Sequence, residues 1–271
     1  MNHCLLCDSC HLQIRDSQAV YCNACGILIN SNARPLDYAE GGGQAPPDDS
    51  KKRWRIENGR MRLALIAPFV DHHSDFIDIG CGSGETLEAA SAFFAHRIGF
   101  DTNPALISHV RECSNATVFR ANFDNTLISN LLSSYGKVFA ASHVLEHLEH
   151  PLVLTDEIVA AMSPGDLLYI EVPLHTGQSF RDFGYDWSLW NHEHMALYAM
   201  HSLDFISRHT GLQVLHRGTR IFARGSKSGS TRLRLLIRSP FRFLKTVIRK
   251  GRHSIADVMV ADYGCIVLRK N

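Results

Sequence analysis

The chain has 271 residues, of which 45% are hydrophobic and 20% are charged. These proportions exclude a disordered, collagen-like or coiled-coil protein and predict a large buried core. The sequence contains no apolar run of about 18 residues, and its start, MNHCLLC, lacks the basic and apolar regions of a secretory signal. We therefore expect a cytoplasmic protein without a transmembrane helix.

The formal net charge of +1 conceals an uneven distribution of charge. Residues 224–252 contain ten Lys and Arg and no acid, which leaves 18 bases against 27 acids elsewhere. Apolar residues recur among these bases at helical spacing, interrupted by Pro240. Such a segment is able to bind an anionic membrane surface, a phosphorylated substrate or RNA, and packing on the protein's own sheet is an equal alternative. Nucleic acid is the least favoured partner because only Phe241 and Phe243 supply aromatic rings.

Five cysteines fall within the first 25 residues, and this crowding indicates a metal site rather than disulfides. Cys4 and Cys7 form one close pair, and Cys22 and Cys25 form a second, a spacing by which two turns present four thiolates to a tetrahedral zinc ion. We favour these four, although Cys10 offers an alternative pair with Cys7, and a redox dithiol is a competing function. A unit this small cannot bury enough surface to be stable alone, so we expect a structural Zn²⁺.

Changes in composition suggest the domain boundaries. Glycines, prolines and acids crowd at 40–49, EGGGQAPPDD, as in a flexible connection. We expect a zinc ribbon at 1–34, a linker at 35–50, a core domain at 51–223, a basic insertion at 224–257 and the last core strand at 258–271.

Beyond residue 50, short apolar runs alternate with segments of helical periodicity. This alternation predicts an α/β fold with a doubly wound, mostly parallel sheet. The expected strands are Phe76–Ile79, Ile98–Phe100, Thr117–Phe119, Val138–Ala141, Leu167–Val172, Leu212–Phe222 and Tyr263–Leu268. One helix is expected from Ser50 onward, and others at 84–95, 104–113, 126–134, 151–162 and 202–209.

A glycine-rich loop follows the first of these strands. Gly80, Gly82 and Gly84 lie between the strand that contains Asp78 and an amphipathic helix. Glycines there let the backbone turn tightly or approach a ligand, and the helix start supplies free N–H groups. Asp101 ends the next strand, where a carboxylate is able to accept hydrogen bonds from both hydroxyls of a ribose. A purely structural turn, with Asp101 capping the next helix, is the alternative.

These segments resemble the class I, Rossmann-like S-adenosylmethionine-dependent methyltransferases. Their first motif is similar to Asp78–Gly84, and 141–151, ASHVLEHLEHP, is similar to a subgroup with Glu-His after the fourth strand. A nicotinamide-binding loop would have the spacing Gly-x-Gly-x-x-Gly instead. The resemblance runs from about Gly59 to Phe222 and returns over the last strand.

The resemblance implies S-adenosylmethionine as the cofactor. Its amino-acid end would lie on the glycine loop, its ribose on Asp101, and its adenine between Asn122 and Phe123, while Ser142 and His143 would face the sulfonium methyl group. The expected cofactor-binding residues are Asp78, Gly80, Gly82, Gly84, Asp101, Asn122, Phe123 and Ser142.

The segment His143-x-x-Glu146-His147 also matches the inverted zinc-protease pattern. That chemistry needs both histidines on one helical face and a further ligand downstream. Because His143 directly follows a predicted strand and Pro151 begins the next helix, a short turn is the favoured interpretation. A zinc hydrolase therefore remains only as an alternative.

A second histidine cluster, His192-Glu193-His194, lies in the connection after the strand at 167–172, where a loop is placed to cover a substrate. It is similar to the signature of sugar C-methyltransferases of deoxysugar pathways. We expect His194 to act as a general base, oriented by Glu193, with His143 and His147 as competing bases. The structural alternative is that this cluster only pins the loop by hydrogen bonds.

The sequence therefore predicts an S-adenosylmethionine-dependent methyltransferase with a small polar acceptor. A sugar or glycan, methylated at oxygen or carbon, is the preferred acceptor. The alternatives are a non-catalytic S-adenosylmethionine-binding or scaffold protein and the zinc hydrolase. Contact of the basic insertion with an anionic membrane would make the protein peripheral to that membrane.

Overall fold

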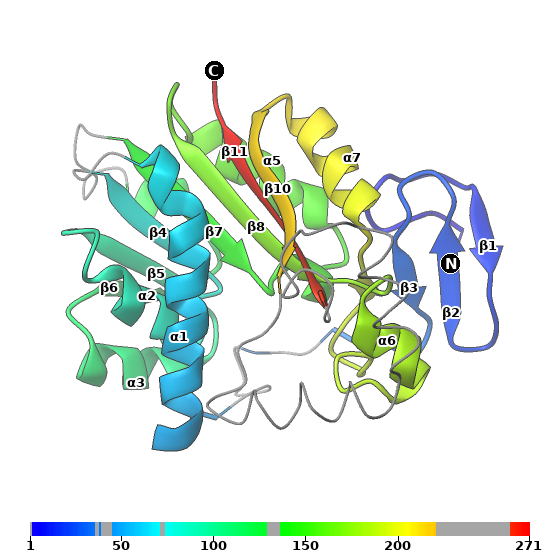
Figure 1. Ribbon diagram of the computed structural model, residues 1–271, viewed down its shortest axis with the longest axis horizontal. Helices are drawn as coiled ribbons and strands as arrows, with labels where there is room; N and C mark the ends of the chain where they lie inside the picture. The colour runs from blue at the N-terminus through cyan, green and yellow to red at the C-terminus, as the bar shows by residue number, and fades with distance from the viewer. Residues whose placement is uncertain (1, 36–37, 39–44, 71–73, 129–135, 221–260) are drawn as a thin grey trace, which may run out of the picture.

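The computed structural model describes residues 2–35, 38, 45–70, 74–128, 136–220 and 261–271 (Figure 1). The predicted basic insertion at 224–257 lies entirely outside the described residues, as does half of the predicted linker, so the partners expected for that insertion stay predictions. Among the described helices, none is both long and apolar enough to cross a membrane.

A seven-stranded sheet forms the centre of the fold and confirms the predicted α/β class. All neighbouring strands run parallel except at β11, which lies antiparallel between β8 and β10. The strand order is β10 (Gln213–Arg220), β11 (Tyr263–Arg269), β8 (Leu167–Pro173), β7 (Lys137–Ser142), β4 (Asp75–Ile79), β5 (Arg97–Asp101) and β6 (Thr117–Arg120).

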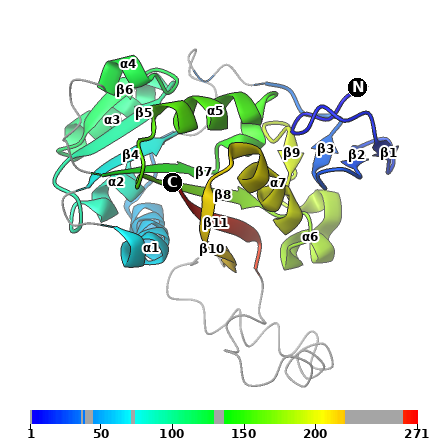
Figure 2. The same cartoon turned by 90° about the horizontal axis from the view of Figure 1, so that it is seen from above.

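Helices cover both faces of this sheet, as the view in Figure 2 shows. The central strands are apolar at successive positions, so alternate side chains enter opposite cores. In β7, Val138 and Ala140 pack with one helix layer and Phe139 with the other. One layer contains α1 (Asp49–Ile66), α2 (Glu85–Ala90) and α3 (Pro104–Cys113), and the other contains α4 (Asn125–Ile128), α5 (Pro151–Ala161) and α7 (Met200–Thr210).

The helix ends depend on local hydrogen bonds. The Asp48 side chain accepts from the N–H of Lys51 and begins α1, and Asn103 caps α3 in the same way. The helix expected at 84–95 ends early, at Ala90, where the Ser91 hydroxyl donates to the carbonyl of Glu88. The helix expected at 126–134 is described only as α4, because 129–134 lie outside the described residues.

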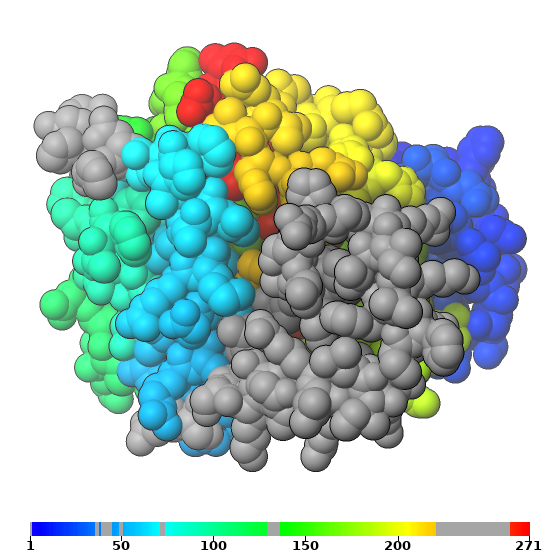
Figure 3. All heavy atoms as spheres, viewed as in Figure 1, coloured from blue at the N-terminus to red at the C-terminus, as the bar shows by residue number. Residues whose placement is uncertain are grey.

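The amino-terminal unit joins the core through a second sheet. Its strands β1 (Leu12–Ile14), β2 (Ala19–Cys22) and β3 (Leu28–Asn30) are followed in the sheet by β9 (Ala196–Leu197), which belongs to the connection after β8. Figure 3 shows this unit in blue at one end of the molecule. Neither β9 nor α6 (Gln178–Phe183), which precedes it, was predicted from the sequence.

Asn30 carries the polar part of this junction. Its backbone N–H donates to the carbonyl of Met195, and its buried amide donates to the carbonyls of Asn191 at 2.8 Å and His194 at 3.2 Å. The end of β3 thus holds the backbone of the predicted catalytic loop.

We expect Asn30→Ala to lower the free energy of unfolding by about 1–3 kcal/mol, because it leaves two carbonyls without donors in a buried junction. Urea denaturation measures the change. The exposed Asn23, in the same unit, is the control, and its alanine variant should change stability by about 0.5 kcal/mol or less. Equal effects of the two substitutions would show that the junction adds no stability.

Candidate functional site

The glycine loop lies between β4 and α2, at the carboxyl edge of the sheet. Gly80, Gly82 and Gly84 all have positive φ, at 68°, 56° and 81°, a region that disfavours other residues. A Cβ on Gly80 would lie 2.6 Å from Cγ2 of Val144, so the turn after β7 packs directly on this loop. Beyond Gly82 and its two chain neighbours, no heavy atom of the described residues lies within 4 Å of a Cβ built on Gly82.

Asp101, the residue predicted to hold a ribose, contacts the glycine loop. One carboxylate oxygen accepts from the N–H of Gly82 at 2.9 Å, and the other accepts from the N–H of Asn103 at 2.8 Å. A carboxylate oxygen has a second lone pair, so both oxygens keep the capacity to accept from a ligand.

The other predicted cofactor residues have different surroundings. Asp78 in β4 is buried, and burial raises its pKa to about 7 against the opposing charge of Arg62. Phe123 packs edge-on against Phe100 and Phe139 in the core, whereas Asn122 is exposed. Ser142 ends β7, and its buried hydroxyl has no hydrogen-bond partner among the described residues.

His143 begins the turn after β7 with a positive φ of 59°. Its Nδ1 lies 3.0 Å from Oε1 of Glu146, and its Nε2 lies 3.1 Å from Oε1 of Glu171. Burial alone would lower the pKa of His143, but the two carboxylates outweigh burial and raise it. The raised pKa favours the protonated form of the imidazole between these two carboxylates, and a protonated ring is unfavourable for a general base.

Glu171, like Glu146, is fully buried. Both of its oxygens accept from Arg220, and Oε1 also accepts from Arg62 at 2.8 Å. The hydroxyl of Tyr169 donates to Oε2 at 2.8 Å. Burial by itself raises the pKa of a carboxyl, but the two arginines hold the pKa of Glu171 well below its usual range.

His194 belongs to the loop after β8, and its side chain is buried, with only 5% of the residue exposed. Its Nδ1 is 2.6 Å from the carbonyl of Leu189. Burial lowers the pKa of His194 to about 4, so the imidazole is neutral near pH 7. Its ring meets that of His147 edge-on, with 4.6 Å between the ring centroids.

His147 connects this loop to the turn after β7. Its Nδ1 lies 3.1 Å from the carbonyl of Glu193 and 2.9 Å from the hydroxyl of Tyr38. Potential ligand atoms of Glu146, His147 and His194 all lie within 4.8 Å of one another. The structure thus brings His194, Glu193 and His143 to one edge of the sheet, beside the glycine loop.

The inverted zinc-protease arrangement is absent from this part of the described chain. Residues Leu145–His147 form a single 3₁₀ turn, and both ring nitrogens of His143 face carboxylates. His143 and His147 therefore do not share a helical face, as the hydrolase alternative requires.

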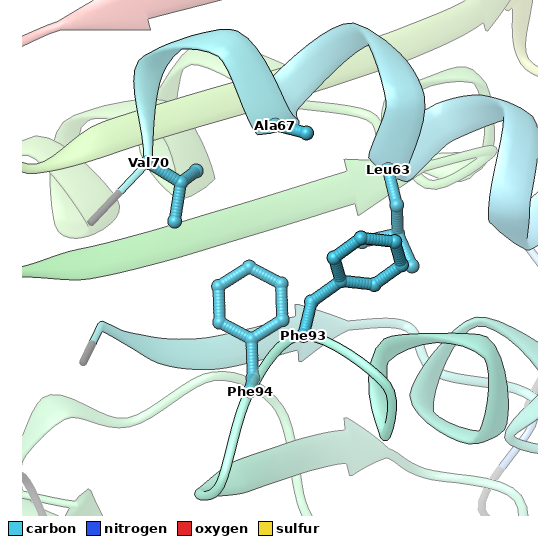
Figure 4. Close-up of a pocket in the computed structure, with 5 residues that line it drawn as sticks. All are labelled: Leu63, Ala67, Val70, Phe93 and Phe94. Carbon is cyan, nitrogen blue, oxygen red and sulfur yellow. The ribbon is translucent and has the colours of Figure 1, made fainter. Parts of the chain in front are cut away.

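An apolar pocket lies elsewhere, at the amino ends of β4 and β5 (Figure 4). Leu63, Ala67, Val70, Phe93 and Phe94 line it. The lining residues that the structure describes include no titratable side chain, and the pocket is at the opposite edge of the sheet from the glycine loop.

The comparisons with known proteins agree with this geometry. A family model described as a methyltransferase domain matches residues 52–217, more than half of the chain. The chain belongs to this methyltransferase domain family. A curated ubiquinone biosynthesis O-methyltransferase from Xylella fastidiosa (strain 9a5c) is 27% identical over 107 residues, which are 38% of this chain and 44% of that protein. The chain thus matches less than half the length of this relative.

Solved methyltransferase structures share the fold. An S-adenosylmethionine-dependent methyltransferase from Archaeoglobus fulgidus has a TM-score of 0.53 and 20% identity, over 81% of this chain and 97% of that one. A putative methyltransferase structure with the Trm112 activator of Haloferax volcanii has a TM-score of 0.56 and 14% identity, over 82% and 94% of the two chains. These similarities establish a Rossmann-like methyltransferase fold.

Attached to this methyltransferase domain is the amino-terminal cysteine cluster. The Sγ atoms of Cys4 and Cys25 are 3.5 Å apart, as are those of Cys7 and Cys22, and all four lie within 4.8 Å of one another. Thiolates around a tetrahedral zinc are about 3.8 Å apart, given a Zn–S bond of about 2.3 Å. Cys10 is exposed and is not part of the cluster. The four predicted ligands therefore fit a structural zinc ion.

Several residues of this methyltransferase's site were not predicted. Glu171, Tyr38 and Asn30 enter it through contacts with residues distant in sequence. Only Glu171 left a signal, because it is an acid within an otherwise apolar strand run. A charge in such a run indicates a buried partner or a functional site.

Metal analysis of the purified protein should find zinc bound by the cysteine cluster. Cys22→Ser should abolish this zinc, because a tetrahedral structural site needs all four thiolates. Cys10→Ser is the control and should retain it. Loss of this zinc in the Cys10 variant would reassign the ligand set.

Proposed function

We propose that this protein transfers a methyl group from S-adenosylmethionine to a small polar acceptor. The observation that carries the proposal is the contact between Asp101 and the glycine loop. It puts a carboxylate suited to a ribose beside a backbone suited to a close ligand, at the carboxyl edge of a parallel sheet. Membership of the methyltransferase domain family supports the same reaction.

Two features of the described residues fit this cofactor. The space above Gly82 is open, so a ligand is able to approach its backbone, and the orphaned hydroxyl of Ser142 lies at the end of the neighbouring strand β7. S-adenosylmethionine, when bound, supplies an activated methyl group on a sulfonium. Asp101 would hold the ribose, and Asp78 with Gly80, Gly82 and Gly84 would hold the amino-acid end. Asn122 and Phe123 remain proposed for the adenine side.

The acceptor would lie between the turn after β7 and the loop after β8. In the loop after β8, Glu193 is proposed to hold or orient an acceptor hydroxyl. His194 is proposed to act on the reacting oxygen through its neutral imidazole. His143 would supply positive charge at the rim of the site. The resemblance of His192-Glu193-His194 to sugar methyltransferases favours a sugar or glycan, and the relative named as an O-methyltransferase favours oxygen over carbon.

A scaffold protein that binds the cofactor without turnover is the second candidate. The experiment that separates the two is incubation with labelled S-adenosylmethionine and an extract of the protein's own cell, followed by fractionation of the labelled product. Enzyme-dependent label in a small polar compound supports the proposal. Saturable cofactor binding with no labelled product in any fraction would support the scaffold instead.

Asp101→Ala should weaken S-adenosylmethionine binding by about 1–3 kcal/mol, or about 5- to 150-fold in Kd. The substitution removes the acceptor for the ribose hydroxyls and also releases the N–H of Gly82. Isothermal titration calorimetry measures the change. Asp156→Ala is a matched control on α5, where that acid pairs only with His209 among the described residues, and should bind as wild type does. Unchanged affinity in Asp101→Ala would overturn the cofactor assignment.

His194→Ala should lower kcat by about 10²- to 10⁴-fold and change cofactor affinity by no more than about twofold. The imidazole is expected to act on the acceptor, whereas the cofactor lies on the glycine loop. Initial rates with the isolated acceptor, together with calorimetry, separate the two effects. The exposed neighbour His192 is the control, and its alanine variant should keep near-normal turnover. Near-normal turnover in His194→Ala, with loss in His147→Ala or His143→Ala, would move the catalytic group to the turn after β7.

A further inference from the structure

Three side chains with metal-binding atoms converge beside the glycine loop, apart from the cysteine cluster. Glu146 and His147 come from the turn after β7, and His194 comes from the loop after β8. Their potential ligand atoms lie within 4.8 Å of one another, a separation that one ion can bridge. The backbone between the two segments is fixed, because the N–H of Met195 donates to the carbonyl of Glu146 at 2.7 Å.

The hydrogen bonds of the two imidazoles determine which nitrogens remain available. Nδ1 of His194 faces the carbonyl of Leu189, and Nδ1 of His147 faces the carbonyl of Glu193. A carbonyl oxygen only accepts, so Nδ1 must carry the proton in both rings. Each Nε2 then presents a lone pair. Histidines that bind metals are typically oriented in this way, by donating the other ring N–H to a carbonyl or carboxylate.

The hydroxyl of Tyr38 completes the outer contacts of His147. It lies 2.9 Å from Nδ1 and is able to donate to Oε2 of Glu193, 3.5 Å away. Its oxygen is therefore free to share the Nδ1 proton of His147, which leaves Nε2 of that ring as the acceptor atom.

Glu146 supplies the observation that points to a missing ligand. The residue is fully buried, its Oε1 pairs with Nδ1 of His143, and its Oε2 has no hydrogen-bond partner among the described residues. A buried carboxylate oxygen without a partner has lost its hydration without a compensating hydrogen bond, which is unfavourable. A cation bound to Oε2 would remove that cost.

We propose that Glu146, His147 and His194 bind one divalent transition-metal cation, with Zn²⁺ as the best match to the donor set. Two imidazoles and one carboxylate are the ligands of a class of catalytic zinc sites, and they leave a fourth position open. The imidazoles disfavour Mg²⁺, which prefers oxygen ligands. His143 is not a ligand, because both of its nitrogens face carboxylates.

The open position would face the acceptor, and this part of the inference rests on the proposed function. A hydroxyl bound to a divalent cation loses its proton more readily, as metal-bound water does. The proton would leave to solvent, and the oxygen would then form the bond to the methyl carbon. The bond from that carbon to the sulfonium sulfur would break in the same step, and S-adenosylhomocysteine would leave with its electron pair. His194 would serve this step as a ligand of the cation, with its Nε2 lone pair, and not as the group that accepts the proton.

Equilibrium dialysis of the full-length protein against Zn²⁺ alone, followed by metal analysis, tests the site. Wild type should bind two zinc ions per chain, one at the cysteines and one at this site. His194→Ala and Glu146→Gln should each bind one, and Cys22→Ser should lose only the other. His192→Ala, in the same loop, should bind two. Glu146→Gln keeps the size of the side chain, so loss of zinc in this variant is not expected to come from unfolding. Near-UV circular dichroism checks that each variant is folded.

Cobalt substitution identifies which site is lost. Thiolate-to-cobalt absorption should remain in His194→Ala and vanish in Cys22→Ser. A single bound ion in wild type, or two in both His194→Ala and Glu146→Gln, would overturn the proposal. Calorimetry with S-adenosylmethionine keeps the two proposals distinct: cofactor binding without a second zinc rejects only this site, and a second zinc without cofactor binding rejects only the proposed function.

Discussion

The ionised carboxylate of Glu171 is the constraint on which the rest of the site depends. It lies fully buried in β8 and is compensated by Arg62 from α1 and Arg220 from β10. Removing one partner from such a pair leaves a charge without compensation, at a cost of about 3–5 kcal/mol. The same carboxylate lies 3.1 Å from Nε2 of His143, which has a left-handed backbone conformation, and His143 in turn pairs with Glu146. One buried charge therefore fixes the turn that packs on the glycine loop.

The loop after β8 is positioned by hydrogen bonds to other parts of the chain. It has little regular structure of its own, and β9 is only two residues long. Its backbone is held by Asn30 from the amino-terminal unit and by the carbonyl of Glu146 from the turn after β7. The unit that carries Asn30 also carries the cysteine cluster, so the amino-terminal unit contributes to the position of His194.

The sequence predicted the framework of the sheet well for a physical reason. Strands buried on both faces are short continuous apolar runs, and each expected strand overlaps an observed one. The glycine loop and Asp101 were predictable because their spacing along the chain is set by one strand, one helix and the next strand. The four cysteines converge as expected because each close pair occupies a single turn.

What the sequence could not supply was the pairing of distant residues. β9 is too short to have a periodic signal, and its partner β3 lies more than half the chain away. The sequence singled out His143 as a base, since nothing in HVLEH shows that both ring nitrogens would meet carboxylates. For His194 the residue type indicated a base, but burial decides its protonation, and burial is a property of the fold.

The pKa values of His143 and His194 are shifted in opposite directions, and the surroundings of the two rings explain this difference. His143 is buried between two carboxylates, whose attraction exceeds the cost of burying its charge. His194 is buried beside a carbonyl and a second imidazole, with no carboxylate in hydrogen-bond contact among the described residues, so burial prevails and its ring stays neutral. Glu146 lies between them. Its Oε1 pairs with His143, and its Oε2 has no hydrogen-bond partner among the described residues. An anion that is only half satisfied, beside the neutral imidazole of His194, leaves this edge of the sheet with a deficit of positive charge.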